Sequence, residues 1–182
     1  MAEIILASGS PFRKAQLHNL GFKFESQSPT LDERELEKSF KDSIEHLADF
    51  LAEKKALEIA EKAPDKIVIG SDQALIFENK SWAKPETLAE ACKRLEMLQG
   101  DTHELHTSLC IKWKQQSIIE KVVSRMFMHP LSQSEIKKYV SLDQPIGCAG
   151  GYKFEQKGSA LFYKVETSDP TSIIGLPPLP LV

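Results

Sequence analysis

Residues 8–14, with the sequence SGSPFRK, have the composition of an anion-binding turn. They follow an apolar run, and Ser10 and Pro11 are typical of the N-cap and the first residue of a helix. Free backbone N–H groups at a helix start attract an anion. The helix dipole disfavours the cations Arg13 and Lys14 there by about a few tenths of a kcal/mol. A phosphate between the two cations would explain them; the alternative is a plain capped helix whose basic residues face water.

Lys55 is a second candidate for binding an anion. On a helical wheel of residues 43–63 it lies between Leu51 and Ile59, inside an apolar stripe. A lysine buried without a partner would lose its charge or cost several kcal/mol, so this position favours a nearby carboxylate or phosphate. The alternative is that the stem is buried while the ammonium group reaches water.

Asp72 is a third candidate, because it follows the apolar run of residues 66–70 and is expected at the end of a strand. Ligands of α/β sheets gather at such strand ends. A carboxylate there can bind a divalent ion or take a proton from an attacking water. Asp32 and Glu33 add carboxylates, and Lys84 adds a cation just before a helix. Together these groups are the inventory of a metal-assisted phosphoryl site, although each also has a plain structural explanation.

The elements that must position these residues alternate between strands and helices. Apolar runs and alternation predict strands at residues 3–8, 22–28, 66–70, 74–77, 103–113, 116–128 and 160–166. Helical periodicity and capping signals predict helices at residues 10–20, 43–63, 86–99 and 132–140. Residues 29–42 are polar and are expected to form an ordered loop or an exposed stretch. The interleaving predicts an α/β fold with a mixed sheet.

Composition excludes several classes of protein. The chain has 182 residues, which suits one domain or one domain cleft into two lobes. A net charge of −3 argues against a protein that coats nucleic acid, but it allows a small anionic ligand. The three cysteines form no CxxC pair, which argues against disulfides and zinc. No signal peptide or long apolar run is present, so we expect a cytoplasmic protein without a membrane partner.

Four segments resemble the Maf-like nucleotide pyrophosphatases. They are LASGSPFRKAQL at 6–17, VIGSDQALIF at 68–77, AKPETLAEA at 83–91 and GLPPLP at 175–180, and their order and spacing match over essentially the whole chain. The resemblance implies one domain over residues 1–182, with an elongated twisted mixed sheet flanked by helices and two lobes around a cleft. It implies hydrolysis of a nucleoside triphosphate to the monophosphate and pyrophosphate with a divalent cation, Mg²⁺ or Mn²⁺. It also suggests a homodimer.

The resemblance assigns roles to individual residues. Asp72 matches the proton acceptor of the family, and Glu33 matches an acidic position near the metal and the phosphates, so both are expected to hold the cation. Phosphate-handling positions are expected at Ser8, Arg13, Lys55 and Lys84, together with Ser10 and Lys14 of the same turn.

Three further positions are expected to select the base. They are Phe12, Gln73 and Glu155, of which Gln73 and Glu155 are similar to the branch of the family that removes 7-methyl-GTP. Glu155 can accept hydrogen bonds from the N1–H and N2 amino groups of guanine, and an aromatic ring at position 12 can stack on the methylated cationic base. That branch usually has Trp at position 12, and the weaker cation–π partner Phe12 is expected to reduce affinity or selectivity.

Two alternatives remain at the level of the sequence. One is an enzyme of the dTTP/UTP branch of the same family, and the other is a non-catalytic nucleotide-binding regulator of cell division.

The end of the chain also departs from the family pattern. Residues 176–182 are rich in proline where the family usually continues into a helix, so that helix is expected to be absent or very short.

Overall fold

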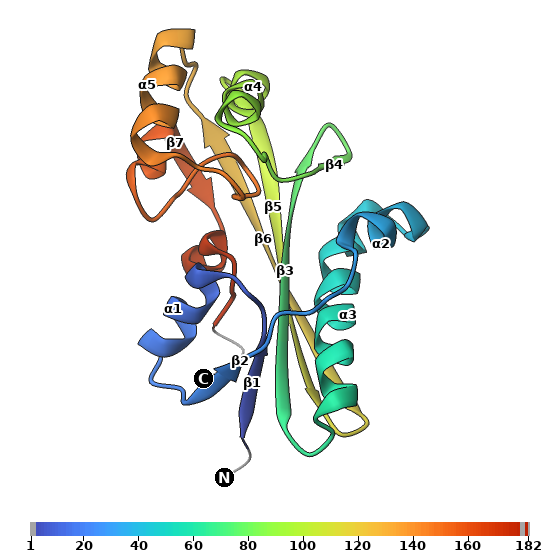
Figure 1. Cartoon of the computed structure of the whole chain (residues 1–182). Helices are drawn as coiled ribbons and strands as arrows, with labels where there is room; N and C mark the ends of the chain where they lie inside the picture. Colours follow the sequence, from blue (N-terminus) through green and yellow to red (C-terminus); the bar gives the residue numbers. More distant parts are fainter. Residues whose placement is uncertain (1–2, 179–180, 182) are drawn as a thin grey trace.

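A computed structural model describes residues 3–178 and residue 181 (Figure 1). Within these residues there is one seven-stranded sheet in the order β2-β1-β3-β5-β6-β7, with β4 paired to β3. The strands are β1 (Ile4–Ala7), β2 (Phe24–Ser26), β3 (Ile67–Phe77), β4 (Lys80–Trp82), β5 (Thr102–Trp113), β6 (Gln116–Met128) and β7 (Phe162–Glu166). The α-helices are α1 (Pro11–Asn19), α2 (Glu33–Ser39), α3 (Leu47–Lys62), α4 (Leu88–Leu98) and α5 (Gln133–Asp143). Short 3₁₀ turns are η1 (Ile44–His46), η2 (Lys157–Leu161) and η3 (Pro170–Ile174).

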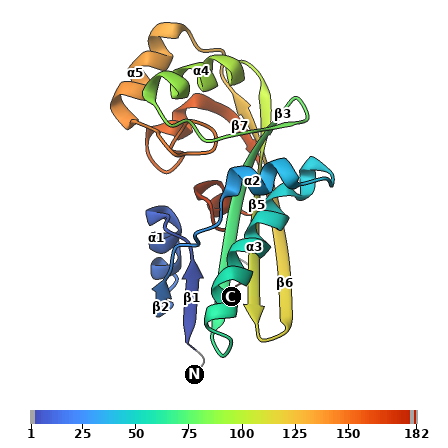
Figure 2. The same cartoon turned by 45° about the vertical axis from the view of Figure 1, so that its right-hand side comes forward.

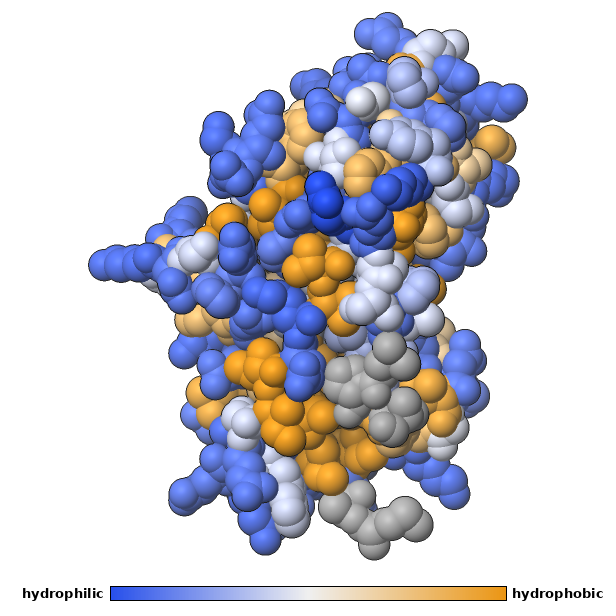
Figure 3. Space-filling model, turned by 180° about the vertical axis from the view of Figure 1, so that it is seen from behind, coloured by the Kyte–Doolittle hydropathy of each residue, from blue (hydrophilic) through white to orange (hydrophobic). Residues whose placement is uncertain are grey.

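The sheet is elongated because β3, β5 and β6 run the length of the molecule (Figures 1 and 2). At one end, β1 and β2 extend the sheet in parallel beside β3, with α1 and α3 on its opposite faces. At the other end, β4 pairs antiparallel with β3 and β7 pairs antiparallel with β6, and α4 and α5 belong to this lobe. The expected α/β fold, with a mixed elongated sheet flanked by helices and divided into two lobes, is confirmed. We call the lobe that contains β1, β2, α1 and α3 the lower lobe. Seen from behind, hydrophobic residues gather on it (Figure 3).

The lower lobe has a core on each face of the sheet, as the two-residue period of a strand requires. Ile5 and Val68 pack with α3, whereas Leu6 and Ile69 pack with Leu17 of α1. At Gly70, a Cβ atom would lie 2.3 Å from the backbone oxygen of Ala52 in α3. Only glycine permits this close approach, which draws α3 onto β3 two residues before Asp72.

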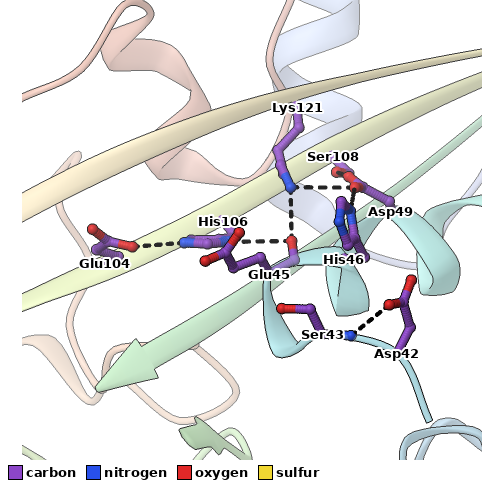
Figure 4. Close-up of polar contacts among 9 residues, drawn as sticks. All are labelled: Asp42, Ser43, Glu45, His46, Asp49, Glu104, His106, Ser108 and Lys121. Atoms are coloured by element: carbon purple, nitrogen blue, oxygen red, sulfur yellow. Dashed lines mark hydrogen bonds and ion pairs between the residues drawn. The ribbon is translucent and has the colours of Figure 1, made fainter. Parts of the chain in front are cut away.

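A polar network fixes the start of α3 to the neighbouring strands (Figure 4). Lys121 of β6 donates to the Glu45 backbone oxygen at 2.7 Å, and its Nζ lies 3.3 Å from Oδ2 of Asp49. Ser108 of β5 also donates to Asp49. His106 of β5 lies on the same side of the sheet, where its Nδ1 is 3.4 Å from the Glu45 backbone oxygen.

Three expectations about the elements were wrong. Residues 66–70 and 74–77 are one continuous strand, β3, because its pairing with β5 runs unbroken from Val68 to Ile76. The polar stretch 29–42 contains α2, which has no buried residue and therefore no apolar stripe to reveal it. The helix expected from residue 43 begins as the 3₁₀ turn η1 and becomes α-helical at Leu47.

The end of the chain is described only in part. Gly175 and residues 176–178 are described, whereas residues 179–180 of the GLPPLP segment and residue 182 lie outside the described residues, so the absence of a following helix stays a prediction. Among the described residues, no helix has the length and apolar character needed to cross a membrane.

Candidate active site

Two adjoining pockets form a cleft between the lobes. The first, of about 330 Å³, is lined by Ser10, Phe12 and Arg13 from one lobe and by Glu155 from the other. The second, of about 420 Å³, is lined by carboxylate residues that include Asp72. Gln73, Lys84, Ile146, Gly147 and Ala149 line both pockets, so the two form a continuous surface.

The expected anion-binding turn is formed at the start of α1. Ser10 is the N-cap, and its hydroxyl accepts the N–H of Arg13 at 3.5 Å, with Pro11 in the first turn. Arg13 does not face water: it is 6% exposed, and its Nε donates to the backbone oxygen of Gly175 at 2.8 Å. Ser8 is buried and accepts from Ser10 N at 3.1 Å and from Arg13 Nη1 at 3.5 Å.

Lys14 differs from its neighbour. It is half-buried on α1 and lines neither of the two cleft pockets. The pair of cations expected to flank a phosphate is therefore reduced to Arg13, because adjacent residues of a helix point in different directions.

Lys55 joins two carboxylates, of which one is buried with it. Its Nζ lies 2.5 Å from Asp72 Oδ1 and 2.8 Å from Glu33 Oε1. Lys55 is 5% exposed and Asp72 is 3% exposed. The ammonium group therefore does not reach water, and the expectation of a carboxylate partner is confirmed. Asp32 instead caps α2 by accepting from Glu35 N at 3.2 Å, which sets Glu33 at the first helical position.

Asp72 occupies the middle of β3 rather than its end. The parallel pairing with β1 stops at Gly70, and Asp72 lies two residues beyond that point, opposite Ser108 of β5. The strand end that exposes the site is thus the end of β1 and not of β3. Ser71, between the two positions, donates to the Gly175 backbone oxygen at 2.9 Å.

The cations around Asp72 keep it ionised. Burial alone would raise its pKa, but the charges of Lys55, Lys84 and Arg13 outweigh that effect and hold the pKa of Asp72 below its ordinary value. Burial lowers the pKa of Arg13, and the negative charge of Asp72 opposes this shift. Lys84 is exposed to the cleft, yet the surrounding protein displaces water from it and lowers its pKa, with Asp72 again opposing. Three cations from separate segments therefore act on one carboxylate.

Glu37 is a residue of this cleft that the sequence did not indicate. It is half-buried and lines the same pocket as Asp72 and Glu33. Burial, and then the negative charges of Asp72 and Glu33, raise the pKa of Glu37. Its spacing of four residues from Glu33 would have placed both on one helix face, but the segment showed no helical pattern.

The three expected selectivity residues all line the first pocket. Phe12 is half-buried and Glu155 is exposed. Gln73 is held by its amide nitrogen, which donates to Thr107 Oγ1 at 2.9 Å and to the backbone oxygens of residues 172 and 173 at 3.0 and 3.1 Å. Only the amide oxygen of Gln73 is left to meet a ligand.

Residues 3–182 match the family model described as Maf-like protein. The chain belongs to the Maf-like protein family. Its relatives include the 7-methyl-GTP pyrophosphatase of Bdellovibrio bacteriovorus, which is 41% identical, with 96% of this chain and 91% of the relative covered. They also include the 7-methyl-GTP pyrophosphatase of Hydrogenovibrio crunogenus, which is 35% identical, with 97% and 88% covered.

A solved structure of a nucleoside-triphosphatase, dITP/XTP pyrophosphatase, from Mycobacterium abscessus is 15% identical to this Maf-like chain. It aligns with a TM-score of 0.46 and covers 87% of this chain and 93% of its own.

Proposed function

We propose that this Maf-like protein hydrolyses 7-methyl-GTP, or a closely similar nucleoside triphosphate, to the monophosphate and pyrophosphate. One observation carries the proposal: Arg13, Lys55 and Lys84, from three separate segments, surround the ionised carboxylate of Asp72 in a cleft. Such a site offers positive charge to phosphates and a base to water. The names of the relatives support the choice of substrate.

The triphosphate lies across the start of α1 in this proposal. The backbone N–H groups of the turn and the Ser10 hydroxyl face its oxygens, and Arg13 and Lys84 neutralise its charge from two sides of the first pocket. Lys55 does not contact the phosphates in this proposal, since it is buried and forms ion pairs with Asp72 and Glu33. Ser8 orients Arg13, and Lys14 contributes only to the general positive charge.

Asp72 orients a water molecule and accepts its proton as the water attacks the α-phosphorus. The new bond joins the water oxygen to this phosphorus, and the bond from the phosphorus to the bridging oxygen of pyrophosphate breaks. Arg13 and Lys84 stabilise the charge that develops on the leaving group. Because the pKa of Asp72 is lowered, its carboxylate is deprotonated at neutral pH and can accept this proton.

A divalent cation fits the donor set. No group of three His, Cys, Asp or Glu residues in the described part of the chain is arranged to hold a metal ion alone. Mg²⁺ usually takes one or two carboxylates and completes its shell with water and substrate phosphates. Asp72 and Glu33, which share Lys55, provide two such carboxylates. The ion would supply charge neutralisation and orientation of the phosphates.

The base lies in the first pocket, between Phe12 and Glu155. Glu155 accepts hydrogen bonds from the N1–H and N2 amino groups of guanine, and its negative charge favours the cationic 7-methylated ring. The Phe12 ring stacks on that ring, as a weaker partner than Trp. Gln73 lines the same pocket, and its amide oxygen is the group left to bind the base.

Release of pyrophosphate from 7-methyl-GTP, GTP, UTP and dTTP tests the proposal. With Mg²⁺ or Mn²⁺ we expect 7-methyl-GTP to be turned over best, and Asp72→Asn to lower kcat by about 10²-fold to 10⁴-fold. Asp65→Asn, which changes an exposed aspartate, is the matched control.

Each alternative has its own outcome in this assay. Full activity of Asp72→Asn would remove the role given to that carboxylate. Equal turnover of UTP and 7-methyl-GTP would favour the dTTP/UTP branch, and tight nucleotide binding without pyrophosphate release would favour a regulator. The homodimer, the single domain and the cytoplasmic location stay predictions, and light scattering of the purified protein decides the first.

A further inference from the structure

The segment that carries Glu155 is held by two phenol hydroxyls. Tyr152 is 5% exposed, and its hydroxyl lies 2.9 Å from Nε2 of His103 on β5. The next residue, Lys153, donates its backbone N–H to the hydroxyl of Tyr139 on α5 at 2.8 Å. Two different elements therefore fix two consecutive residues just before Glu155.

His103 is suited to hold a neutral hydroxyl. It is 1% exposed, and burial together with the charge of Arg94 lowers its pKa to about 3. Its ring is neutral at physiological pH and has one N–H. Its ring centroid lies 5.7 Å from that of Tyr152 and 5.9 Å from that of Phe162, so packing restricts the ring as well. The contacts of His103 therefore hold the Tyr152 hydroxyl and ring in place.

Glu155 depends on its backbone for its position. Its side chain is exposed and makes no hydrogen bond or ion pair with any residue in the described part of the chain. The backbone oxygen of Lys153 accepts from Gln156 N at 3.1 Å and from Gly158 N at 3.0 Å, which closes a turn around Glu155. A Cβ at Gly158 would lie 2.5 Å from that oxygen, so the turn needs glycine there.

We propose that Tyr139 and His103 are positioning residues for base selection, because they fix residues 152 and 153 and thereby place Glu155 against the base. This inference rests on the proposed function, in which Glu155 reads the base. Neither residue contacts the substrate. Tyr139 acts through the backbone of Lys153, and His103 acts through the hydroxyl of Tyr152, whose side chain lines the base pocket.

Phosphate binding and base selection use different residues of the cleft. This difference makes it possible to distinguish the positioning role from a general structural one. The residues proposed to handle phosphate, Arg13 and Lys84, come from other segments and are common to all nucleoside triphosphates. Loss of position at Glu155 should therefore change the preference between bases and leave turnover of a poorly recognised base unchanged. A merely structural loss would lower turnover of every nucleotide in proportion.

The experiment measures kcat/KM for 7-methyl-GTP and for UTP in Tyr139→Phe, which removes only the hydroxyl that accepts the Lys153 N–H. We expect the ratio of the two values to fall by up to about tenfold, the size of effect expected when one hydrogen bond is lost. Tyr163→Phe on β7 removes a hydroxyl from a tyrosine that is 59% exposed, and this control should keep the wild-type ratio.

His103 is tested by a pair of variants. His103→Leu cannot form a hydrogen bond with the Tyr152 hydroxyl, so it should lower the ratio of the two kcat/KM values as much as Tyr152→Phe does. The variant that combines His103→Leu with Tyr152→Phe should lower this ratio no further. His103→Gln retains an amide that can reach the hydroxyl and should restore part of the ratio. Thermal unfolding of each variant shows whether it is folded.

The outcomes are distinct from those of the proposed function. A wild-type ratio in Tyr139→Phe and His103→Leu, or equal losses on both nucleotides, overturns the positioning role. Calorimetric dissociation constants of 7-methyl-GTP and UTP give a second selectivity ratio, which does not require turnover. If the wild-type protein releases no pyrophosphate, the hydrolase proposal fails while the binding ratio still decides the positioning proposal; absence of both binding and turnover overturns both.

Discussion

At the scale of single residues, the Lys55 ammonium group is the centre of the site's electrostatics. Two carboxylates share it, and one of them, Asp72, is buried with it. A buried ion pair gives little net stability, because desolvation offsets the attraction, but removal of one partner leaves the other charge uncompensated. The pair is therefore better explained by its effect on Asp72 than by a contribution to folding.

Lys55→Met should lower the free energy of unfolding by about 3 kcal/mol, because it leaves the Asp72 carboxylate buried without its nearest partner. Asp72→Asn added to this variant should recover part of the loss, since the buried carboxylate charge is then removed as well. Urea unfolding at neutral pH measures both effects. Lys54→Met, on the neighbouring half-buried lysine, should change stability by less than about 0.5 kcal/mol; equal effects of the two lysine variants would contradict the argument.

Two of the site residues could be identified without the family resemblance because they conflict with their local pattern. Lys55 interrupts an apolar helix face, and Arg13 opposes a helix dipole, so each indicated an unseen partner. Glu37 conflicts with nothing, because it lies among other charged residues in a polar stretch. Lys14 has the same local pattern as Arg13, and only the direction of its side chain separates the two.

At the scale of elements, α2 is a seven-residue helix that holds carboxylates at the cleft. It has no buried residue, so packing does not fix it strongly. The loop before it is attached to α3 by Glu58, whose carboxylate accepts from Thr30 N at 2.9 Å and Thr30 Oγ1 at 2.7 Å. Lys62 donates to the same carboxylate at 2.7 Å.

These contacts predict a pH dependence for Glu58→Gln. The hydrogen bonds from Lys62 and Thr30 lower the pKa of Glu58 from 4.5 to about 2 in the folded protein. The stabilisation by the charged form is therefore complete above pH 4.5 and is lost as the pH falls toward 2. Glu58→Gln should cost about 1 kcal/mol at neutral pH, and this difference should shrink across that range.

Urea unfolding at a series of pH values checks the Glu58 prediction. Glu61→Gln changes an exposed glutamate one turn away and should show no such difference. A difference between wild type and Glu58→Gln that stays constant down to the lowest pH would show that the charge of Glu58 is not responsible.

The elements themselves were predictable where periodicity was strong. The helices at α1, α4 and α5 and the long hairpin of β5 and β6 follow from apolar spacing and caps in the sequence. The continuity of β3 was not predictable, because Ser71 and Asp72 are polar residues inside a buried strand. Only their contacts with other segments explain why they lie there. β4 is three residues long and gave no pattern of its own.

At the scale of the whole molecule, Gly175 joins the two ends of the sequence. Its backbone oxygen accepts from Arg13 Nε and from Ser71 Oγ, and its φ of 119° is one that L-residues rarely adopt. The alternation of strands and helices predicted the class of fold, but no local pattern could predict a hydrogen bond between residues 162 positions apart. The family resemblance included this segment but assigned it no role.

Gly175→Ala should lower stability by about 1–2 kcal/mol through backbone strain, and should also lower kcat/KM for pyrophosphate release because the acceptor of Arg13 moves. Gly21→Ala is a matched control, since Gly21 has a φ of 81° and nothing within 4 Å of its added Cβ. Similar thermal destabilisation of the two variants with activity lost only in Gly175→Ala is the expected result. Equal activity of the two variants would show that the hydrogen bond from Arg13 to Gly175 is not needed for pyrophosphate release.

The bond between Arg13 and Gly175 also has a consequence for synthesis of the chain. A ribosome adds about 5–20 residues per second, so roughly ten to thirty seconds pass between the appearance of these two residues. Throughout that interval the guanidinium of the emerging chain lacks the carbonyl that orients it. Nascent chains can therefore form the first helix early, but the proposed phosphate site stays incomplete until Gly175 has been added, and under the proposed function a product released before Gly175 would be unable to hydrolyse nucleotide.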